Sequence, residues 1–209
     1  MNISVLLKDV LALSALILSV INGLMLLRQY ARDRAILNVH PVHPEVYQWW
    51  FRLPDGEVNG MPTRRYGFLV YADIVNRGLR RVALESWLLF IKTQAQRQKQ
   101  ELKPLSITEP IYESDSFTKV FPVLGQRGLT HEGQSVVDSG CGVTGWAYYR
   151  AEYYGDERWN PVITDEKIEG TFVVRDILGG KAKTEVTFSK RDLETIEDFI
   201  PGIATIGVS

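Results

Sequence analysis

The chain divides into one uninterrupted apolar run and a long segment in which apolar and polar residues alternate. The run, Val10 to Leu27, carries no charged residue over eighteen positions and is bounded by Asp9 and Arg28. An α-helix rises about 1.5 Å per residue, so this run covers roughly 27 Å, close to the roughly 30 Å of a bilayer's hydrocarbon core. The pattern predicts a short leader at residues 1–9, then a transmembrane helix with a juxtamembrane extension at residues 10–35.

A buried core helix and a cleaved signal peptide are the alternatives for this run. Core helices are rarely apolar on every side. A signal peptide has a positively charged N-terminal region and small residues before its cleavage site. Here the positive charge of Lys8 is cancelled by Asp9. The run is followed by RQYARDRA, which lacks the A-x-A arrangement of small residues at a cleavage site. We therefore expect an uncleaved signal anchor that crosses the bilayer once.

The charges beside the run predict its direction. Arg28, Arg32 and Arg34 follow it, whereas the N-terminal side offers Lys8 and the α-amine. Cytoplasmic flanks of membrane helices carry the excess of Lys and Arg. We expect the N-terminus outside and the large domain in the cytoplasm.

A stripe of small residues follows one side of the predicted helix. Ala15, Ser19 and Gly23 recur every four positions. Small residues at this spacing let two membrane helices approach closely. The stripe suggests self-association through the helix, with the alternative that small residues are simply common in membrane helices.

Residues 36–188 carry the two-residue alternation of half-buried β-strands. The strongest run is Tyr66 to Asn76, where one face of the strand is formed by Phe68, Val70, Ala72 and Ile74. Val82 to Ile91 follows after the turn Asn76-Arg77-Gly78. An Asn-x-Gly turn between two such runs predicts a hairpin.

A second hairpin is predicted across Gly179-Gly180, between Ile168–Leu178 and Lys181–Phe188. Several such runs separated by turn signals are typical of antiparallel sheets, and their number favours an immunoglobulin-like β-sandwich over residues 36–188. A small barrel is the alternative. The predicted fold class is mainly β, with one N-terminal transmembrane helix.

The end of the chain, residues 189–209, predicts a short amphipathic helix and an apolar tail. Ser189 has the character of an N-cap, and Leu193, Ile196 and Ile200 lie on one helical face. Pro201-Gly202 ends the helix.

Composition and net charge limit the classes of partner and the cellular compartment that we expect for this protein. The chain has 209 residues, a net charge of −1 and one cysteine, Cys141. The charge gives no case for nucleic-acid binding, so the bilayer and a protein are the expected partners. One cysteine excludes an internal disulfide, which agrees with a reducing compartment.

Two segments resemble a known group of proteins. YADIVNRGLRRVALESW, from Tyr71 to Trp87, resembles a hairpin of small membrane-anchored bacterial and phage proteins, which join one apolar helix to an immunoglobulin-like sandwich. TFVVRDILGGKAK, from Thr171 to Lys183, is similar to their late hairpin. The resemblance implies the fold and the anchor, and it carries over no functional residue.

Two clusters have the residue types of chemical sites. His40 and His43 could bind a metal ion, but no second cluster supplies further ligands, and two surface histidines are the alternative. Cys141 with His131 could form a nucleophile and base, but a free cysteine is more often a small hydrophobic residue. Phosphate-binding and hydrolase motifs are absent from the sequence. We predict no catalytic, cofactor or metal site.

Two other features suit binding. Trp49 and Trp50 lie in a strand of aromatic residues, which predicts that one of them contacts a partner or the membrane interface. Five arginines near predicted strand ends could meet anionic lipid or an acidic partner: Arg64, Arg65, Arg77, Arg80 and Arg81. The alternative for these arginines is a solvated rim.

The leading hypothesis is a membrane-anchored, non-catalytic interaction or structural module. The alternatives are a membrane-bound enzyme that uses Cys141 and His131 or the two histidines, and an accessory subunit of a membrane complex.

Overall fold

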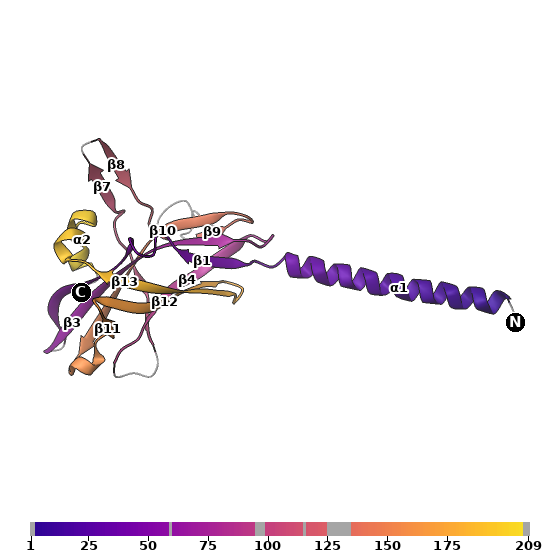
Figure 1. The fold of residues 1–209 in the computed structure, drawn as a ribbon, viewed down its shortest axis with the longest axis horizontal. Helices are drawn as coiled ribbons and strands as arrows, with labels where there is room; N and C mark the ends of the chain where they lie inside the picture. The colour runs from indigo at the N-terminus through magenta and orange to yellow at the C-terminus, as the bar shows by residue number, and fades with distance from the viewer. Residues whose placement is uncertain (1–2, 59, 95–98, 115, 125–134, 207–209) are drawn as a thin grey trace.

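A computed structural model describes residues 3–58, 60–94, 99–114, 116–124 and 135–206. The chain begins with one long helix, α1 (Ile3–Arg32), that extends away from a β-rich domain (Figure 1). Its stretch Leu11–Tyr30 is long and apolar enough to cross a membrane, and none of it is buried against the domain. Thirty residues of helix span about 45 Å.

The domain is mainly β, as the sequence predicts. Its strands are β1 (Leu37–Pro41), β2 (Gln48–Val58), β3 (Met61–Asn76), β4 (Val82–Ile91), β5 (Gln100–Leu102), β6 (Pro104–Leu105), β7 (Ile111–Ser114), β8 (Phe117–Val120), β9 (Ser135–Val137), β10 (Gly142–Tyr154), β11 (Ile163–Thr164), β12 (Lys167–Asp176) and β13 (Lys181–Lys190). The helical segments after α1 are η1 (Glu157–Trp159), α2 (Leu193–Phe199) and η2 (Ile203–Thr205).

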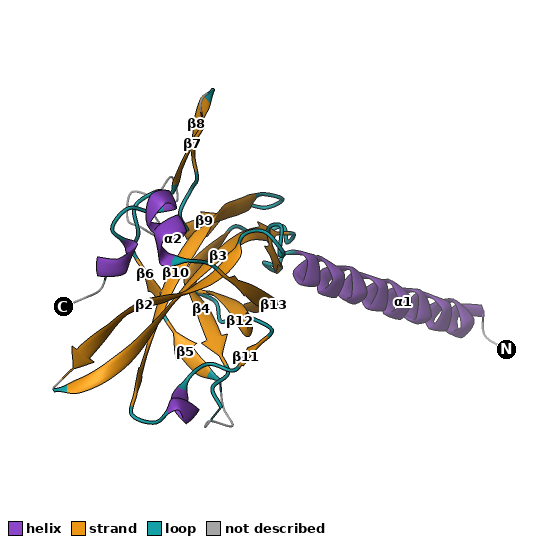
Figure 2. Cartoon of the chain, turned by 60° about the vertical axis from the view of Figure 1, so that its left-hand side comes forward, coloured by secondary structure: helices purple, strands orange, loops and turns teal. Residues whose placement is uncertain are grey.

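One large sheet runs in the order β5-β4-β12-β13-β2-β3-β10-β6. Strand β1 also pairs with β3, β9 with β4, and β11 with β12, and β7 and β8 form a separate two-stranded sheet. The pairings are antiparallel except for the short parallel contact of β13 with β2. The sheet bends so that β4 and β12 face β3 and β10 across a shared core (Figure 2).

Strand β3 is buried on both faces, and this produces two cores. The predicted face of β3 is confirmed: it is fully buried in an inner core with β4, β10, β12 and β13, through Phe68, Val70, Ala72 and Ile74. Leu69, on the other face, packs in an outer core with Trp146 of β10 and Ile196 of α2. The outer core therefore joins the C-terminal helix to the sheet.

The first predicted hairpin is wrong in its pairing. Strands β3 and β4 form almost where expected, but β3 pairs with β1, β2 and β10, and β4 pairs with β5, β9 and β12. At the corner, Gly78 lies against the backbone of residues 34–36 and has no room for a Cβ. The buried Asn76 side chain accepts the Gly78 N–H at 3.0 Å and donates to the Val137 carbonyl at 3.2 Å. The segment is a crossover between the two halves of the sheet.

The second predicted hairpin is confirmed. Strands β12 and β13 pair in continuous register from Lys167 with Ser189 to Arg175 with Lys181. Gly179, with φ of 86°, supplies the left-handed residue that the turn needs.

The C-terminal helix is confirmed, but its start is not at Ser189. Strand β13 continues to Lys190, and Asp192 is the N-cap of α2. Ser189 pairs with both Lys167 and Trp49 in the sheet, so the strand continues past the predicted boundary. Ile196 and Ile200 are fully buried, as the predicted helical face requires.

Candidate functional site

Aromatic rings gather on the outer face of the β2–β3–β10 layer. Tyr71 of β3 and Trp146 of β10 are register partners, and their stacked rings lie 4.9 Å apart between centroids. Trp49 of β2 lies 5.2 Å from the Trp146 ring. Alternation along each strand places these three side chains on the face opposite to the inner core.

Helix α2 and Phe121, which directly follows β8, form the walls around these rings. Phe199, at the end of α2, lies 5.4 Å from the Trp146 ring and 5.5 Å from the Trp49 ring. Phe121 lies 5.5 Å from Phe199. Edge-to-face contacts of this kind hold aromatic groups rigidly, because each ring edge meets the electron-rich face of the next.

The β7–β8 hairpin completes a groove over this cluster. We call it the aromatic groove; it has a volume of about 890 Å³ and is lined by Tyr47, Trp49, Ile111, Tyr112, Phe117, Lys119, Phe121, Thr195, Asp198, Phe199 and Pro201. The hairpin projects from the main sheet beside α2 (Figure 2). It exposes apolar side chains to about half of their area: Ile111 41%, Tyr112 50%, Phe117 55% and Val120 49%.

The groove is apolar with one charge of each sign. The Lys119 ammonium group lies 4.6 Å from the centre of the Phe121 ring, and the Asp198 carboxylate lies on the wall formed by α2. Burial raises the pKa of the Tyr71 phenol below the groove, and Tyr47 and Asp73 raise it further. The groove therefore suits a ligand that is mainly apolar and carries little net charge.

The structure separates the two predicted tryptophan contacts. Trp49 lines the groove and is partly exposed. Trp50 is the buried member of the pair, because only 5% of its surface is exposed, so it is not available for the contact. Its ring packs in the inner core, and its Nε1–H donates to the Glu166 carbonyl at 2.8 Å.

The arginines also divide into two groups. Arg64 donates to the Asn160 side chain and to the Gly155 and Asp156 carbonyls, and Arg65 is paired with Glu152 at 3.0 Å. Both side chains therefore bond to other groups of the domain. Arg77, Arg80 and Arg81 lie exposed at the opposite end of β3, beside α1. Arg81 is paired with Asp138 at 3.2 Å.

The residues of the two predicted chemical clusters lie at the surface. His40 and His43 are exposed, and His43 packs edge-on against Tyr47 with ring centroids 5.7 Å apart. Cys141 is exposed in the turn before β10, and His131 lies outside the described residues. Among the residues that the structure describes, no three His, Cys, Asp or Glu side chains gather as metal ligands would.

The predicted anchor residues lie on α1. Ala15, Ser19 and Gly23 are exposed on the helix, and a Cβ at Gly23 would meet nothing within 4 Å. Arg28 and Arg34 are exposed near its C-terminal end, where Arg32 is its last residue. Their roles in pairing and in topology stay predictions.

The sequence did not indicate Tyr112, Phe117 or Phe199 as groove residues. A signal was present in YESDSF, where aromatic residues flank a short polar turn, as in an exposed hairpin. The place of this hairpin beside α2 depends on tertiary packing.

Comparisons with known proteins give no family. No family model and no curated protein matches the chain. One similar solved structure is a protein from Bordetella pertussis described as ApaA, with 13% identity and a TM-score of 0.27, covering 76% of this chain and 96% of that one. Another is the structural genomics target SoR45, with 10% identity and a TM-score of 0.28, covering 82% and 91%. These two similarities are too distant to indicate a function for this chain. The resemblance to small anchored proteins stays a prediction.

Proposed function

We propose that this chain is a single-pass, membrane-anchored and non-catalytic interaction module that binds an apolar segment of a partner protein in the aromatic groove. The observation that supports this most is the β7–β8 hairpin, which holds four exposed apolar side chains beside an aromatic cavity. Contiguous exposed apolar surface in a folded domain marks an interaction site. A two-stranded hairpin is also only marginally stable by itself, so a bound partner would stabilise it.

A polypeptide is the occupant that fits both the groove and the hairpin. Within the described strands, β7 pairs with β8 alone, which leaves the other edge of β7 open to an added strand. A partner strand on this edge would satisfy its backbone groups through main-chain hydrogen bonds, while alternate side chains fill an adjoining apolar pocket. Apolar partner residues would pack against Trp49 and Phe199.

Helix α1 supports the membrane part of the proposal. Its exposed apolar stretch is as long as a bilayer core requires, and the absence of a cleavage signature favours an uncleaved anchor. The basic residues Arg28, Arg32 and Arg34 favour a cytoplasmic domain with the N-terminus outside. The strands that face each other across the inner core are compatible with an immunoglobulin-like sandwich, and we assign the domain to that type within the same proposal.

Photo-crosslinking in native membranes tests the proposal. A photoreactive amino acid at Tyr112, in the groove, is compared with one at Ile163, which is similarly exposed (41%) but lies on β11. We expect one protein adduct from position 112, with the attached peptide rich in apolar residues, and none from position 163. Equal adducts from both positions would contradict a specific groove.

A substitution within the groove sharpens this test. In the chain with the probe at position 112, Phe117→Ser removes an exposed ring from the hairpin and should lower the adduct yield about tenfold, as a loss of roughly 1.4 kcal/mol of binding free energy would do. The matched control Met61→Ser changes an apolar residue of similar exposure (53%) at the start of β3, outside the groove lining, and should leave the yield unchanged. An adduct unaffected by Phe117→Ser would place the partner elsewhere.

A further inference from the structure

The end of the domain beside α1 carries two turns with exposed apolar residues. We call residues 77–81 and 176–180 the juxtamembrane turns. They present three large apolar side chains that are more than half exposed: Leu79 53%, Ile177 60% and Leu178 62%. Exposed apolar side chains at two neighbouring turns form one surface rather than scattered single residues.

Buried polar residues fix both turns with these side chains outward. Asn76 is fully buried and accepts the Gly78 N–H at 3.0 Å. Asp176, only 4% exposed, accepts the N–H groups of Leu178 and Gly180, each at 2.8 Å. The Ile177 N–H donates to the Ala83 carbonyl at 3.1 Å, which ties the second turn to β4. The two turns are therefore rigid parts of the sheet.

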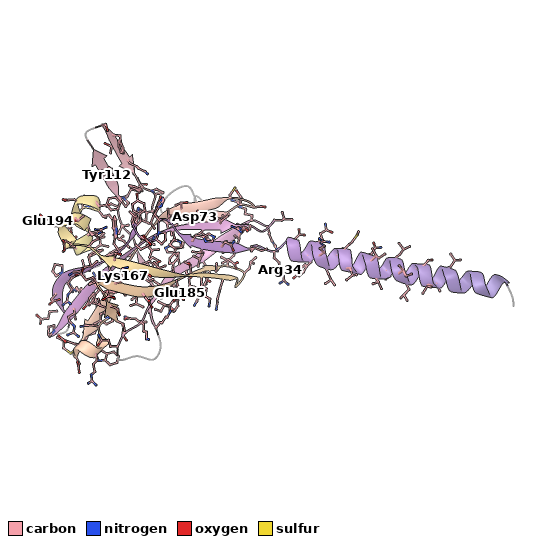
Figure 3. The ribbon with its side chains drawn as sticks, in the orientation of Figure 1. Arg34, Asp73, Tyr112, Lys167, Glu185 and Glu194 are labelled. Carbon is pink, nitrogen blue, oxygen red and sulfur yellow. The ribbon has the colours of Figure 1, made fainter. Side chains whose placement is uncertain are left out.

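The turns lie at the level of the last turns of α1. Leu79 lines one cavity together with Met25, Arg28 and Gln29 of the helix. A second cavity of about 770 Å³ lies between the end of α1 and both turns, with Tyr30, Arg34, Arg80 and Leu178 among its walls. Figure 3 places Arg34 at this junction of helix and domain.

The link from helix to domain is short and fixed. The Arg77 N–H donates to the Ile36 carbonyl at 2.8 Å, and Gly78 packs against the backbone of residues 34–36. If Met25 lies in the hydrocarbon region, Leu79 lies at its boundary. The side chains of the turns then cannot leave the interface unless the link rearranges.

The charges around the turns are mostly positive. Arg34, Arg77, Arg80 and Lys181 are exposed there, and Arg81 is paired with Asp138. The exposed carboxylate of Asp33 also lines both cavities. Basic residues beside exposed apolar side chains match the anionic headgroups and upper acyl chains of a bilayer. The carboxylate of Asp176 takes no part in this surface, because it is buried and bonded to the turn backbone.

We propose that the juxtamembrane turns rest on the bilayer, with Leu79, Ile177 and Leu178 at the boundary of headgroups and acyl chains and the arginines on anionic headgroups. This inference rests on the proposed anchoring through α1 and adds a second contact, which fixes the orientation of the domain. A domain held this way presents its groove at a constant angle to the membrane.

Site-specific fluorescence quenching tests the contact. The full chain carries Cys141→Ser and one new cysteine labelled with an environment-sensitive dye, at Leu178→Cys, Leu18→Cys or Ile163→Cys. Each variant is reconstituted into phosphatidylcholine and phosphatidylserine vesicles that contain two quencher lipids, one with the quencher near its headgroup and one with the quencher within its acyl chains. Position 18 reports on the anchor, and position 163 lies at the opposite end of β12 from the turn.

We expect strong quenching at positions 18 and 178 and none at position 163. Quenching at 18 without quenching at 178 would overturn this inference and leave the anchor intact. No quenching at 18 would overturn the anchor and with it the proposed function. If a partner protein rather than lipid covers the turns in the cell, position 18 would be quenched and position 178 would not, because the vesicles contain no other protein.

Charge reversal tests the headgroup contact. Arg77→Glu with Arg80→Glu should lower quenching at position 178 about twofold, because both changes replace attraction to anionic lipid by repulsion. The matched control Arg158→Glu lies on η1, away from α1, and should leave quenching unchanged. Unchanged quenching in the double variant would overturn the role of the arginines.

Discussion

Asn76 holds together three parts of the domain that are distant in sequence. Its side-chain oxygen accepts the N–H groups of Ile36 and Gly78 at 3.3 and 3.0 Å, and its amide donates to the carbonyls of Arg80 and Val137 at 2.7 and 3.2 Å. The residue is fully buried, so water cannot replace these bonds.

We expect Asn76→Ala to lower the free energy of unfolding by about 2–4 kcal/mol, because backbone groups at the crossover lose their partner without gaining water. Denaturant unfolding of the detergent-solubilised full chain, followed by tryptophan fluorescence, measures this. Arg77→Ala, next in sequence but exposed, is the control and should stay within about 0.5 kcal/mol of the original. Equal stability of the two variants would contradict the role of Asn76.

Single-residue patterns predicted one side of the sheet better than the other. The alternation identified Phe68, Val70, Ala72 and Ile74 as a buried face, because period two is a local property of a strand. It could not decide between Trp49 and Trp50, since both faces of the β2–β3–β10 layer are covered. Which face stays accessible depends on α2, which lies more than 140 residues later in the sequence.

Helix α2 is the element that closes the outer core. Ile196→Ala removes a fully buried side chain and should lower the free energy of unfolding by about 2–5 kcal/mol, because the cavity cannot close completely. The neighbouring exposed Glu194→Ala is the matched control and should change it by less than about 0.5 kcal/mol. Thermal or denaturant unfolding distinguishes the two, and a neutral Ile196→Ala would mean that α2 is not packed on the sheet.

The two predicted hairpins show where sequence reasoning succeeds at the scale of elements. The β12–β13 turn is closed by local bonds from Asp176 and by Gly179 in the left-handed region, so the turn sequence is sufficient. The segment around Asn76 has similar turn residues, yet its bonds reach Ile36 and Val137. Partners at such distances are not visible in a turn motif.

The aromatic groove was not predictable for the same reason. Its walls come from β2, the β7–β8 hairpin and α2, which meet only in the folded domain. The sequence indicated Trp49 as a possible contact residue. The structure shows that Tyr112 and Phe199 line the same groove.

At the scale of the whole molecule, the proposed membrane contact and the proposed groove use different parts of the domain. Arg34 marks the junction with α1, and Tyr112 marks the projecting hairpin, well away from the helix (Figure 3). A partner in the groove would therefore not compete with lipid at the juxtamembrane turns. Helix α1 would hold the module at the membrane, and the β7–β8 hairpin would determine which partner it binds.

Tethering by an uncleaved α1 is the central claim, and the intact mass of the chain in carbonate-washed membranes tests it most directly. Alkaline carbonate removes peripheral proteins and leaves those that cross the bilayer. We expect the full chain of 23.7 kDa to stay in the membrane pellet. A shorter chain that lacks α1 and appears in the soluble fraction would contradict it, because the helix would then be a cleaved signal peptide.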